Sequence, residues 1–451
     1  MLFNSWAFLL FFPIVTTVYF LLPPRFRNLF LLAASCFFYA NYVPAYIFIL
    51  FFLITLDYRL ALIIESSPRN KKKSWLVLSI GANVLTLLVF KYFDFFTGNT
   101  ILLPIGLSFH TMQSMSYIIE VFREKQKTER NFLTYALYVM FFPQLVAGPI
   151  ERPQNLLRQF YEVHEFDIKR ALSGFQLILF GFYKKVVIAD YLSTLVDHVY
   201  RNPTQSSGTD FVIASVTFSM QIYCDFSGYS DIARGTARVI GFELHQNFDH
   251  PFGASNLAEL WKRWHITLTN WFRDYVYIPL GGSKKSSSTT FLNIMLVFLL
   301  SGLWHGAGWT FLAWAALNGL MVAFLHLFAG RFKLKSRAFG ILLTYLYFSF
   351  TIIFFRSPSI GSALFIVSRL FSGGALNMAS FNIALAVALI ASLEIIHFAQ
   401  RNFQIIKVWF SQKIWQKWLA YYVSAVILIV LTYLSVANQN NLDQPFIYFQ
   451  F

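Results

Sequence analysis

Apolar residues come in long runs that are separated by short polar loops, a pattern that predicts several membrane-spanning helices. Each run is close to, or somewhat shorter than, the roughly 20 residues that a helix needs to cross a bilayer. The runs are Leu2–Leu22, Leu29–Ala40, Ala45–Ile64, Trp75–Phe96, Ile101–Val121, Phe132–Ala147, Ala338–Phe355, Met378–Phe398 and Trp418–Ala437. We therefore predict an all-α, polytopic membrane protein with a single domain over residues 1–451.

The distribution of charge adds an orientation. Of the 451 residues, 57% are hydrophobic and 13% are charged, whereas about a quarter are charged in soluble domains. The formal net charge is +15, and basic residues collect after every second run, at Arg25 and Arg27, Arg69–Lys73 and Arg123–Arg130. Because short cytoplasmic loops are rich in lysine and arginine, we expect these loops in the cytoplasm and the N-terminus outside. The expected partner is the lipid bilayer and not nucleic acid.

Two features at the chain level exclude other classes. No basic residue precedes the first run and no small-residue cleavage site follows it, so we expect a retained span and not a signal peptide. The two cysteines, Cys36 and Cys224, lie far apart in apolar surroundings. They predict neither a disulfide framework nor a metal site.

The middle of the chain is less regular. Three prolines within Phe142–Pro153 predict a shaped loop, and Lys184 and Lys185 interrupt the apolar run Ala171–Asp190. The segment Asp225–Asp231 is too polar to lie against lipid, and its glycine and serines predict a tight turn. Irregular backbone at membrane depth is tolerated only where protein or a cavity surrounds it. We therefore expect the chemistry in this part of the chain.

One amphipathic helix is predicted over Asn256–Tyr275. Asn256 can cap it, Glu259 can complete a capping box, and apolar residues recur at helical spacing. On a helical wheel, His265 stands between the apolar side and a basic side. An interfacial helix with snorkelling basic side chains and no catalytic role would give the same pattern.

A further histidine, His305, lies in a segment at membrane depth. The run Phe291–Phe328 is long enough to cross a bilayer and start back, and it contains Ser301-Gly302-Leu303-Trp304-His305-Gly306-Ala307-Gly308-Trp309. An ionisable side chain in hydrocarbon costs free energy unless it has a partner or a wet cavity, so His305 indicates a functional site. The alternative is a histidine that only hydrogen-bonds a neighbouring helix.

These residue types favour acyl transfer. Neutral imidazole is suited to take a proton from a hydroxyl near neutral pH and return it to a leaving group, so His265 and His305 could converge on one cavity. An oxyanion could be held by the amides around Gly306 and Gly308, by Trp304, and by the hydroxyls of Tyr223 and Ser227. An anionic donor could be held by Lys262, Arg263 and Arg273. Asp225 could anchor hydroxyls or the basic helix.

Other classes of site have less support. The sequence has no His-Glu-x-x-His metal motif, no Gly-x-x-x-x-Gly-Lys phosphate loop and no Gly-x-Ser-x-Gly nucleophile elbow. A transporter that uses intramembrane histidines and acids as proton relays is the alternative. The matched half-repeats of many secondary transporters are not found.

Five short segments carry a resemblance to a known family. They are Gly148-Pro149-Ile150-Glu151-Arg152, Tyr223-Cys224-Asp225-Phe226-Ser227-Gly228-Tyr229-Ser230-Asp231, Trp264-His265-Ile266-Thr267-Leu268-Thr269-Asn270-Trp271-Phe272-Arg273-Asp274-Tyr275, Pro279-Leu280-Gly281-Gly282 and Gly302-Leu303-Trp304-His305-Gly306. In this order they resemble the membrane-bound O-acyltransferases, and within them the bacterial branch of alginate O-acetylation membrane proteins. The closing Pro445-Phe446-Ile447-Tyr448-Phe449 resembles the end of that branch.

The resemblance implies roles for particular residues. His305 corresponds to the histidine taken as catalytic in the family, and His265 corresponds to its second conserved polar position. Arg152 is the arginine of the first motif and is expected to contact substrate. The resemblance also implies a ring of transmembrane helices, with shorter tilted or re-entrant helices around a central funnel.

The resemblance implies reactants as well. Acetyl-CoA is the expected donor, used as a substrate, and no bound cofactor is expected. The acetyl group would pass across the bacterial cytoplasmic (inner) membrane toward a separate extracytoplasmic acetyltransferase that modifies a polysaccharide such as alginate. A related branch moves D-alanine from a carrier protein toward teichoic acid and is the alternative.

Overall fold

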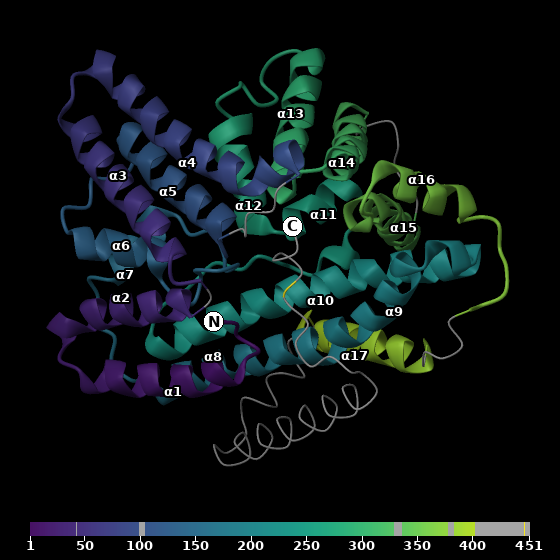
Figure 1. Cartoon of the computed structure of the whole chain (residues 1–451), viewed down its shortest axis with the longest axis horizontal. Helices are drawn as coiled ribbons and strands as arrows, with labels where there is room; N and C mark the ends of the chain where they lie inside the picture. Colours follow the sequence, from purple (N-terminus) through teal and green to yellow (C-terminus); the bar gives the residue numbers. More distant parts are fainter. Residues whose placement is uncertain (42, 99–103, 329–335, 378–382, 402–445, 447–451) are drawn as a thin grey trace. The chain divides into compact units, whose positions relative to one another are not determined.

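The computed structural model describes residues 1–41, 43–98, 104–328, 336–377, 383–401 and 446, and in this part of the chain the regular structure is helical, with no strand (Figure 1). Its helical segments that are long and apolar enough to cross a membrane are Tyr46–Ser66, Arg69–Thr97, Ile168–Arg201, Ser287–His305, Trp309–Leu327 and Arg337–Arg356. The chain is therefore a multi-pass, all-α membrane protein, as the apolar runs predict.

The chain forms two compact units, each built from segments that are distant in sequence. The first unit comprises Met1–Ile178, Tyr229–Asn247 and Ile266–Leu280, and the second comprises Leu179–Gly228, Phe248–His265 and Gly281–Phe451. The expectations of one domain over residues 1–451 and of a ring of helices around a funnel stay predictions.

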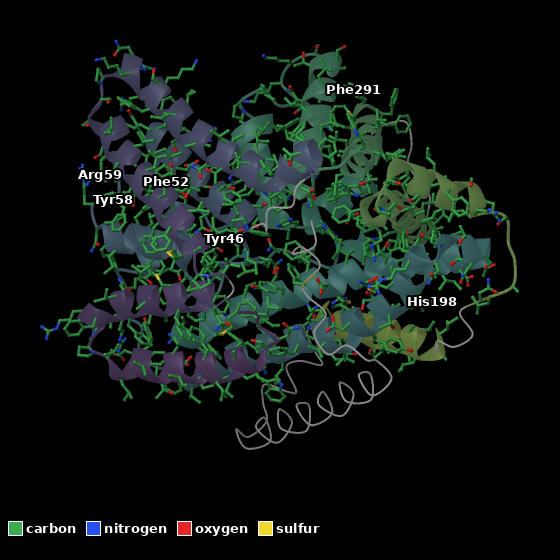
Figure 2. The ribbon with its side chains drawn as sticks, in the orientation of Figure 1. Tyr46, Phe52, Tyr58, Arg59, His198 and Phe291 are labelled. Atoms are coloured by element: carbon green, nitrogen blue, oxygen red, sulfur yellow. The ribbon has the colours of Figure 1, made fainter. Side chains whose placement is uncertain are left out.

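The first unit contains a group of membrane helices and several short helices. It contains α1 (Trp6–Leu21), α2 (Pro24–Ala40), α3 (Tyr46–Ser66), α4 (Arg69–Thr97), α5 (Leu107–Phe122), α6 (Phe132–Met140), α7 (Pro153–Gln159), the start of α8 (Ile168–Phe182), and α12 (Ile266–Phe272) with the π-helical turn Arg273–Tyr277. Helices α3, α4 and α5 pack against one another. On α3, Leu53 and Asp57 are buried, whereas Phe52 and Arg59, both labelled in Figure 2, are exposed. One face of α3 thus packs inside the unit while the other is exposed.

The second unit contains the remaining helices and a large apolar core. It contains the π-helical turn Tyr183–Ala189, α9 (Asp190–Arg201), the first part of α10 (Gly208–Ile240), α11 (Leu257–Arg263), α13 (Ser287–His305), α14 (Trp309–Leu327), α15 (Arg337–Arg356), α16 (Ile360–Arg369) and α17 (Ile383–Arg401), with short 3₁₀ turns at Pro203–Gln205 and Pro251–Gly253. Ser286 caps α13 by accepting a hydrogen bond from the Thr289 amide. Helices α13 and α14 pack as the hairpin that the run Phe291–Phe328 predicts.

Several predicted runs change their ends in the structure. The run Phe132–Ala147 is shorter than predicted because α6 ends at Met140 and gives way to a buried loop. The shaped loop that the three prolines of Phe142–Pro153 predict is therefore confirmed. The run Met378–Phe398 is described from Ile383 onward as α17, and Trp418–Ala437 lies outside the described residues, as does the closing segment 445–449 except Phe446.

The predicted turn at Asp225–Asp231 is wrong, because α10 continues through it without a break. Gly228 is needed for close packing and not for a turn. A Cβ atom at this position would lie 2.7 Å from the carbonyl oxygen of Gly181 and 3.0 Å from the backbone nitrogen of Lys185. The polar residues of this segment therefore lie on a buried helix and find their partners inside the protein.

The single helix predicted over Asn256–Tyr275 is also wrong. The chain forms α11, breaks at Trp264 and His265, and starts again as α12. The cap at Asn256 is confirmed, since its side chain accepts a hydrogen bond from the Glu259 amide. The predicted capping box is not formed, because the Glu259 carboxylate accepts from the Ser255 amide and not from that of Asn256. The helical wheel therefore fails beyond Arg263, and His265 lies in a buried break between two helices instead of at the seam between an apolar and a basic face of one helix.

Candidate functional site

His305 lies at the C-terminal end of α13 with a defined proton arrangement. Its side chain is buried, and Nδ1 lies 2.7 Å from the backbone oxygen of Ser301, one helical turn earlier. A carbonyl oxygen can only accept a hydrogen bond, so Nδ1 donates and carries the proton of the neutral ring. The lone pair is then on Nε2, the nitrogen that can act as a base.

Aromatic rings surround this imidazole. Ring centroids of Trp304, Trp314 and Phe355 lie 4.9, 5.1 and 5.6 Å from that of His305. These rings come from α13, α14 and α15, so three helices of the second unit build the site wall. Such an apolar wall keeps water away and strengthens electrostatic interactions with a reacting group.

The glycines of this motif are explained by packing. A Cβ atom on Gly302 would lie 2.7 Å from the Cβ of Ala315, so glycine lets α13 and α14 approach closely. A Cβ atom on Gly306 would lie 2.1 Å from the Phe311 ring, whereas one on Gly308 would meet nothing closer than 3.6 Å. The Gly306 amide already donates to the Gly302 carbonyl at 3.1 Å. This bond ends α13 and competes with the predicted oxyanion role of that amide.

His265 lies in the same unit as His305 and in an unusual backbone conformation. Its φ is +43°, which is rare for a residue with a side chain and costs about 1–3 kcal/mol. Its ring lies 4.6 Å from the Phe226 ring and 5.8 Å from the Trp304 ring. Because Trp304 also contacts His305, the two histidines predicted to converge lie on one aromatic cluster.

The environment of His265 sets its charge. The residue lies outside the candidate membrane spans and is buried. Burial lowers the pKa of His265 well below its ordinary value, and the nearby His305 lowers it further. The imidazole is therefore neutral near pH 7 and can exchange hydrogen bonds with a neutral reactant.

The backbone around His265 explains the break between the helices. On one side, the Asp249 amide donates to the Arg263 carbonyl at 2.9 Å. On the other side, the Ile266 amide donates to the Asn247 carbonyl at 2.8 Å. These bonds tie α11 to Asp249 and α12 to Asn247, and they take the place of helical bonds at the break.

Two polar residues of α10 bind the lysines of the π-helical turn and so belong to a second polar cluster. Asp225 lies 2.6 Å from Nζ of Lys185, and Ser227 accepts a hydrogen bond from Lys184 at 3.0 Å. Lys185 also pairs with Asp190 at 2.8 Å. The π-helical turn Tyr183–Ala189 directs these two consecutive lysines to different partners. The charge of Lys185 is thus paired with two carboxylates inside the protein, and Lys184 donates to a hydroxyl.

Tyr223 connects the α10 cluster to the core. Its hydroxyl lies 3.4 Å from Nε2 of His397 on α17, and its ring lies 5.6 Å from Phe248 and 6.1 Å from Trp264. Trp264 directly precedes His265, so Tyr223 supports the break that carries this histidine. These contacts favour a positioning role for Tyr223 over the predicted oxyanion role.

The predicted basic residues are divided between the units. Lys262 is exposed and Arg263 pairs with Glu259 at 2.6 Å, both on α11 in the second unit. Arg152 and Arg273 lie in the first unit, where both pair with Asp274, at 3.1 and 2.8 Å. Within the residues that the structure describes, no group of three or more histidine, cysteine, aspartate or glutamate side chains could hold a metal ion.

Some residues that contact the two histidines were not predicted from the sequence. Ser301 precedes His305 by one helical turn, so its carbonyl could have been found from helix periodicity alone. Trp314, Phe355 and Phe226 could not, because their contacts depend on how separate helices pack.

Comparison with known proteins agrees with these motifs. The model of the membrane-bound O-acyltransferase family matches residues 84–364, which include both histidines. A probable alginate O-acetylase AlgI of Pseudomonas putida is 34% identical over 100% of this chain and 100% of that protein. A peptidoglycan O-acetyltransferase of Helicobacter pylori is 34% identical over 81% of this chain and 78% of that protein. A teichoic acid D-alanyltransferase of Streptococcus thermophilus is 26% identical over 52% of this chain and 60% of that protein.

Proposed function

Since the chain belongs to the membrane-bound O-acyltransferase family, in the branch of the alginate O-acetylases, we propose that it transfers an acetyl group from cytoplasmic acetyl-CoA to an acceptor on the far side of the membrane. The chain is a multi-pass membrane O-acyltransferase; the donor, the direction and the dependence on histidine are the proposed part. Acetyl-CoA is a substrate in this proposal and not a bound cofactor.

The observation that carries the mechanism is the hydrogen bond from Nδ1 of His305 to the Ser301 carbonyl. It supports a base at Nε2. The acceptor O–H bond breaks as its proton moves to Nε2, while the oxygen forms a bond to the thioester carbonyl carbon. When the tetrahedral intermediate collapses, the C–S bond breaks and the imidazolium returns the proton to the leaving sulfur. The products are the acetyl ester and free CoA thiol.

The position of His305 favours the charged intermediate of this cycle. The ring lies at the C-terminal end of α13, where the partial negative charge of the helix dipole stabilises a cation by about 0.3–1 kcal/mol. The surrounding aromatic rings limit proton loss to water. Trp304 contacts both histidines and is proposed to contact the reactants.

His265 is proposed to orient donor or acceptor and not to transfer the proton. Its neutral ring and its strained backbone suit a group that is held in one orientation for hydrogen bonding. Asp225, Ser227 and Tyr223 are proposed to support this arrangement through Lys185, Lys184 and the core.

The proposed partners follow from the reaction. An acyl group delivered to the far side needs an exported acceptor, and a separate extracytoplasmic acetyltransferase that modifies a polysaccharide is the proposed one. The proposed location is a bacterial cytoplasmic membrane, as the family branch suggests. The distribution of loop charge supports an N-terminus on the outside.

The test uses purified protein in liposomes with acetyl-CoA that is labelled in the acetyl group. CoA release and transfer of label to the exported partner are followed in wild type, His305→Ala and His198→Ala. His198 is an exposed histidine on α9 and serves as the matched control (Figure 2). We expect His305→Ala to lower the rate about 10²–10⁴-fold, the usual contribution of a general base, and His198→Ala to leave it unchanged.

Two results would contradict this proposal. A folded His305→Ala protein that keeps most of its transfer rate would give His305 a structural role. No turnover of acetyl-CoA by wild type with the exported partner present, together with transfer from a D-alanyl carrier protein, would replace the donor.

A further inference from the structure

Three arginines from separate segments bind Asp274 in the first unit, and two of them also contact the ring of Tyr275. Arg152 lies just before α7, Arg123 ends α5, and Arg273 begins the π-helical turn that also holds Tyr275. The guanidinium carbons of Arg152 and Arg123 lie over the Tyr275 ring, 4.3 and 5.1 Å from its centroid. Asp274 ties the group together.

The bonds at Asp274 show how the arginines are held. Arg152 Nη2 lies 3.1 Å from Oδ2 of Asp274 and Arg273 Nε lies 2.8 Å from Oδ1, while Arg123 Nη2 donates to the backbone oxygen of Asp274 at 3.1 Å. Both carboxylate oxygens are therefore occupied. Arg123 also pairs with Glu120 at 3.6 Å. Three guanidinium groups and two carboxylates leave one positive charge.

The cluster has more donors than its own carboxylates need. A guanidinium group offers five N–H donors, and Arg273 bonds Asp274 through Nε, which leaves its two Nη groups for another ligand or solvent. The side chains of Arg123, Arg152 and Arg273 are 27%, 21% and 55% exposed. A set of arginines that is positioned by packing yet open to solvent is suited to bind phosphate oxygens in pairs.

The local backbone and the loop charge add to this argument. The turn Arg273–Tyr277 is π-helical, with the Ile278 amide donating to the Arg273 carbonyl at 2.9 Å, and single π-turns occur frequently at functional sites. Arg123 begins the basic loop Arg123–Arg130, which is expected on the cytoplasmic side. A cytoplasmic phosphate compound could therefore reach the cluster.

We propose that Arg123, Arg152 and Arg273, which are held together by Asp274, form a phosphate-binding site. Its ligand is the phosphate-bearing nucleotide end of the donor thioester, an assignment that rests on the proposed function. An anionic lipid headgroup offers the same chemistry at the membrane surface. Lys262 and Arg263 are not part of this site, because they lie on α11 of the other unit.

The test measures binding without turnover. Equilibrium affinities for CoA, 3′-dephospho-CoA and pantetheine, which lacks phosphate, are compared in wild type, Arg273→Gln and Arg123→Gln. We expect each variant to bind CoA about tenfold more weakly and pantetheine equally well, because one charge-assisted hydrogen bond is lost. Arg273→Lys should recover part of the affinity because it keeps the charge.

Arg158→Gln is the matched control. Arg158 lies in the same unit, is 74% exposed and pairs with Glu162 at 3.3 Å, so its loss removes one surface arginine outside the cluster. Arg152→Gln is a less specific variant because it also removes a hydrogen bond from Arg152 to the Ser116 hydroxyl inside the first unit. Melting temperatures confirm that each variant is folded before affinities are compared.

The lipid source is distinguished in the same proteins. Melting temperatures are compared in nanodiscs of neutral lipid and of phosphatidylglycerol. A stabilisation by phosphatidylglycerol that disappears in Arg273→Gln, with CoA affinity unchanged, would assign the phosphate site to a lipid headgroup. Unchanged CoA affinity and unchanged lipid response in both variants would overturn the site.

These outcomes separate this site from the proposed function. Arginine-dependent CoA binding without acetyl transfer would support the site and reject the donor reaction. Acetyl transfer by a wild type whose arginine variants bind CoA normally would do the reverse.

Discussion

Gly306 and Gly308 flank the same short turn after His305, yet the structure predicts different effects of alanine at the two positions. Their φ values are −167° and −170°, an extended conformation that alanine adopts without strain. The difference is steric. At Gly306 a Cβ atom would lie 2.1 Å from Cε2 of Phe311, and at Gly308 the nearest neighbour would be 3.6 Å away.

The magnitude follows from how firmly the blocking ring is held. Phe311 is 8% exposed, and its ring packs 5.1 Å from Phe355, which in turn lies 5.6 Å from His305. The ring cannot yield without moving the wall of the site. Overpacking of this kind costs about 1–3 kcal/mol. Because the contact is so close, we expect Gly306→Ala to lower the free energy of unfolding by about 3 kcal/mol.

For Gly308→Ala two small effects oppose each other. Alanine restricts the unfolded chain and stabilises the fold by about 0.4–1 kcal/mol. Gly308 is also the N-cap of α14, where glycine is preferred to alanine. The net change should stay within about 1 kcal/mol, so Gly308→Ala is the matched control.

The assay combines thermal unfolding in detergent with acetyl transfer in liposomes. Gly306→Ala should unfold at a clearly lower temperature and lose activity at temperatures where it is still folded, because His305 shifts with Phe355. Gly308→Ala should resemble wild type in both measurements. Equal melting temperatures and equal activities for the two variants would refute the steric argument.

Three further predictions concern the other polar residues. Asp225→Ala should lower the free energy of unfolding by about 2–3 kcal/mol. This is somewhat less than the loss of a whole buried pair costs, because Lys185 retains Asp190 as a partner. A normal melting temperature with a lost transfer rate would instead make Asp225 part of the site. His265→Asn should reduce transfer less than His305→Ala, since asparagine still hydrogen-bonds; an inactive variant with normal donor binding would give His265 a proton-transfer role. The hydrogen bond to Glu151 raises the pKa of His245. The stability lost in His245→Gln should therefore be greatest below about pH 6.5 and should vanish as the pH rises through the raised pKa. Thermal unfolding of both proteins at several pH values measures this difference. A difference that grows with pH would contradict that pairing.

The last prediction also explains a residue of the first motif. The buried Glu151 carboxylate accepts hydrogen bonds from the His245 amide at 2.6 Å and the Asn155 side chain at 2.7 Å, and pairs with the His245 ring at 2.8 Å. It therefore ties the start of α7 to the segment after α10 within the first unit. Its neighbour Arg152 belongs to the arginine cluster, so adjacent motif residues serve the scaffold and the proposed phosphate site.

The sequence by itself determined the membrane class, most helices and the two central histidines. Long apolar runs can be satisfied in a bilayer only by helices, and a histidine such as His305 at membrane depth needs a partner. These are local properties of composition and spacing. The helix periodicity also contained the Ser301 partner of His305, although it was not recognised in the sequence.

Tertiary structure alone decided how the polar residues are used. Asp225 is part of a continuous buried helix because Lys185 neutralises it, and the helix predicted through His265 breaks because residues 247 and 249 offer its backbone other partners. Arg123 and Tyr275 became a candidate site only when α5 met the π-helical turn. Each outcome depends on contacts between residues distant in sequence, whose geometry no local pattern of hydrophobic and polar positions contains.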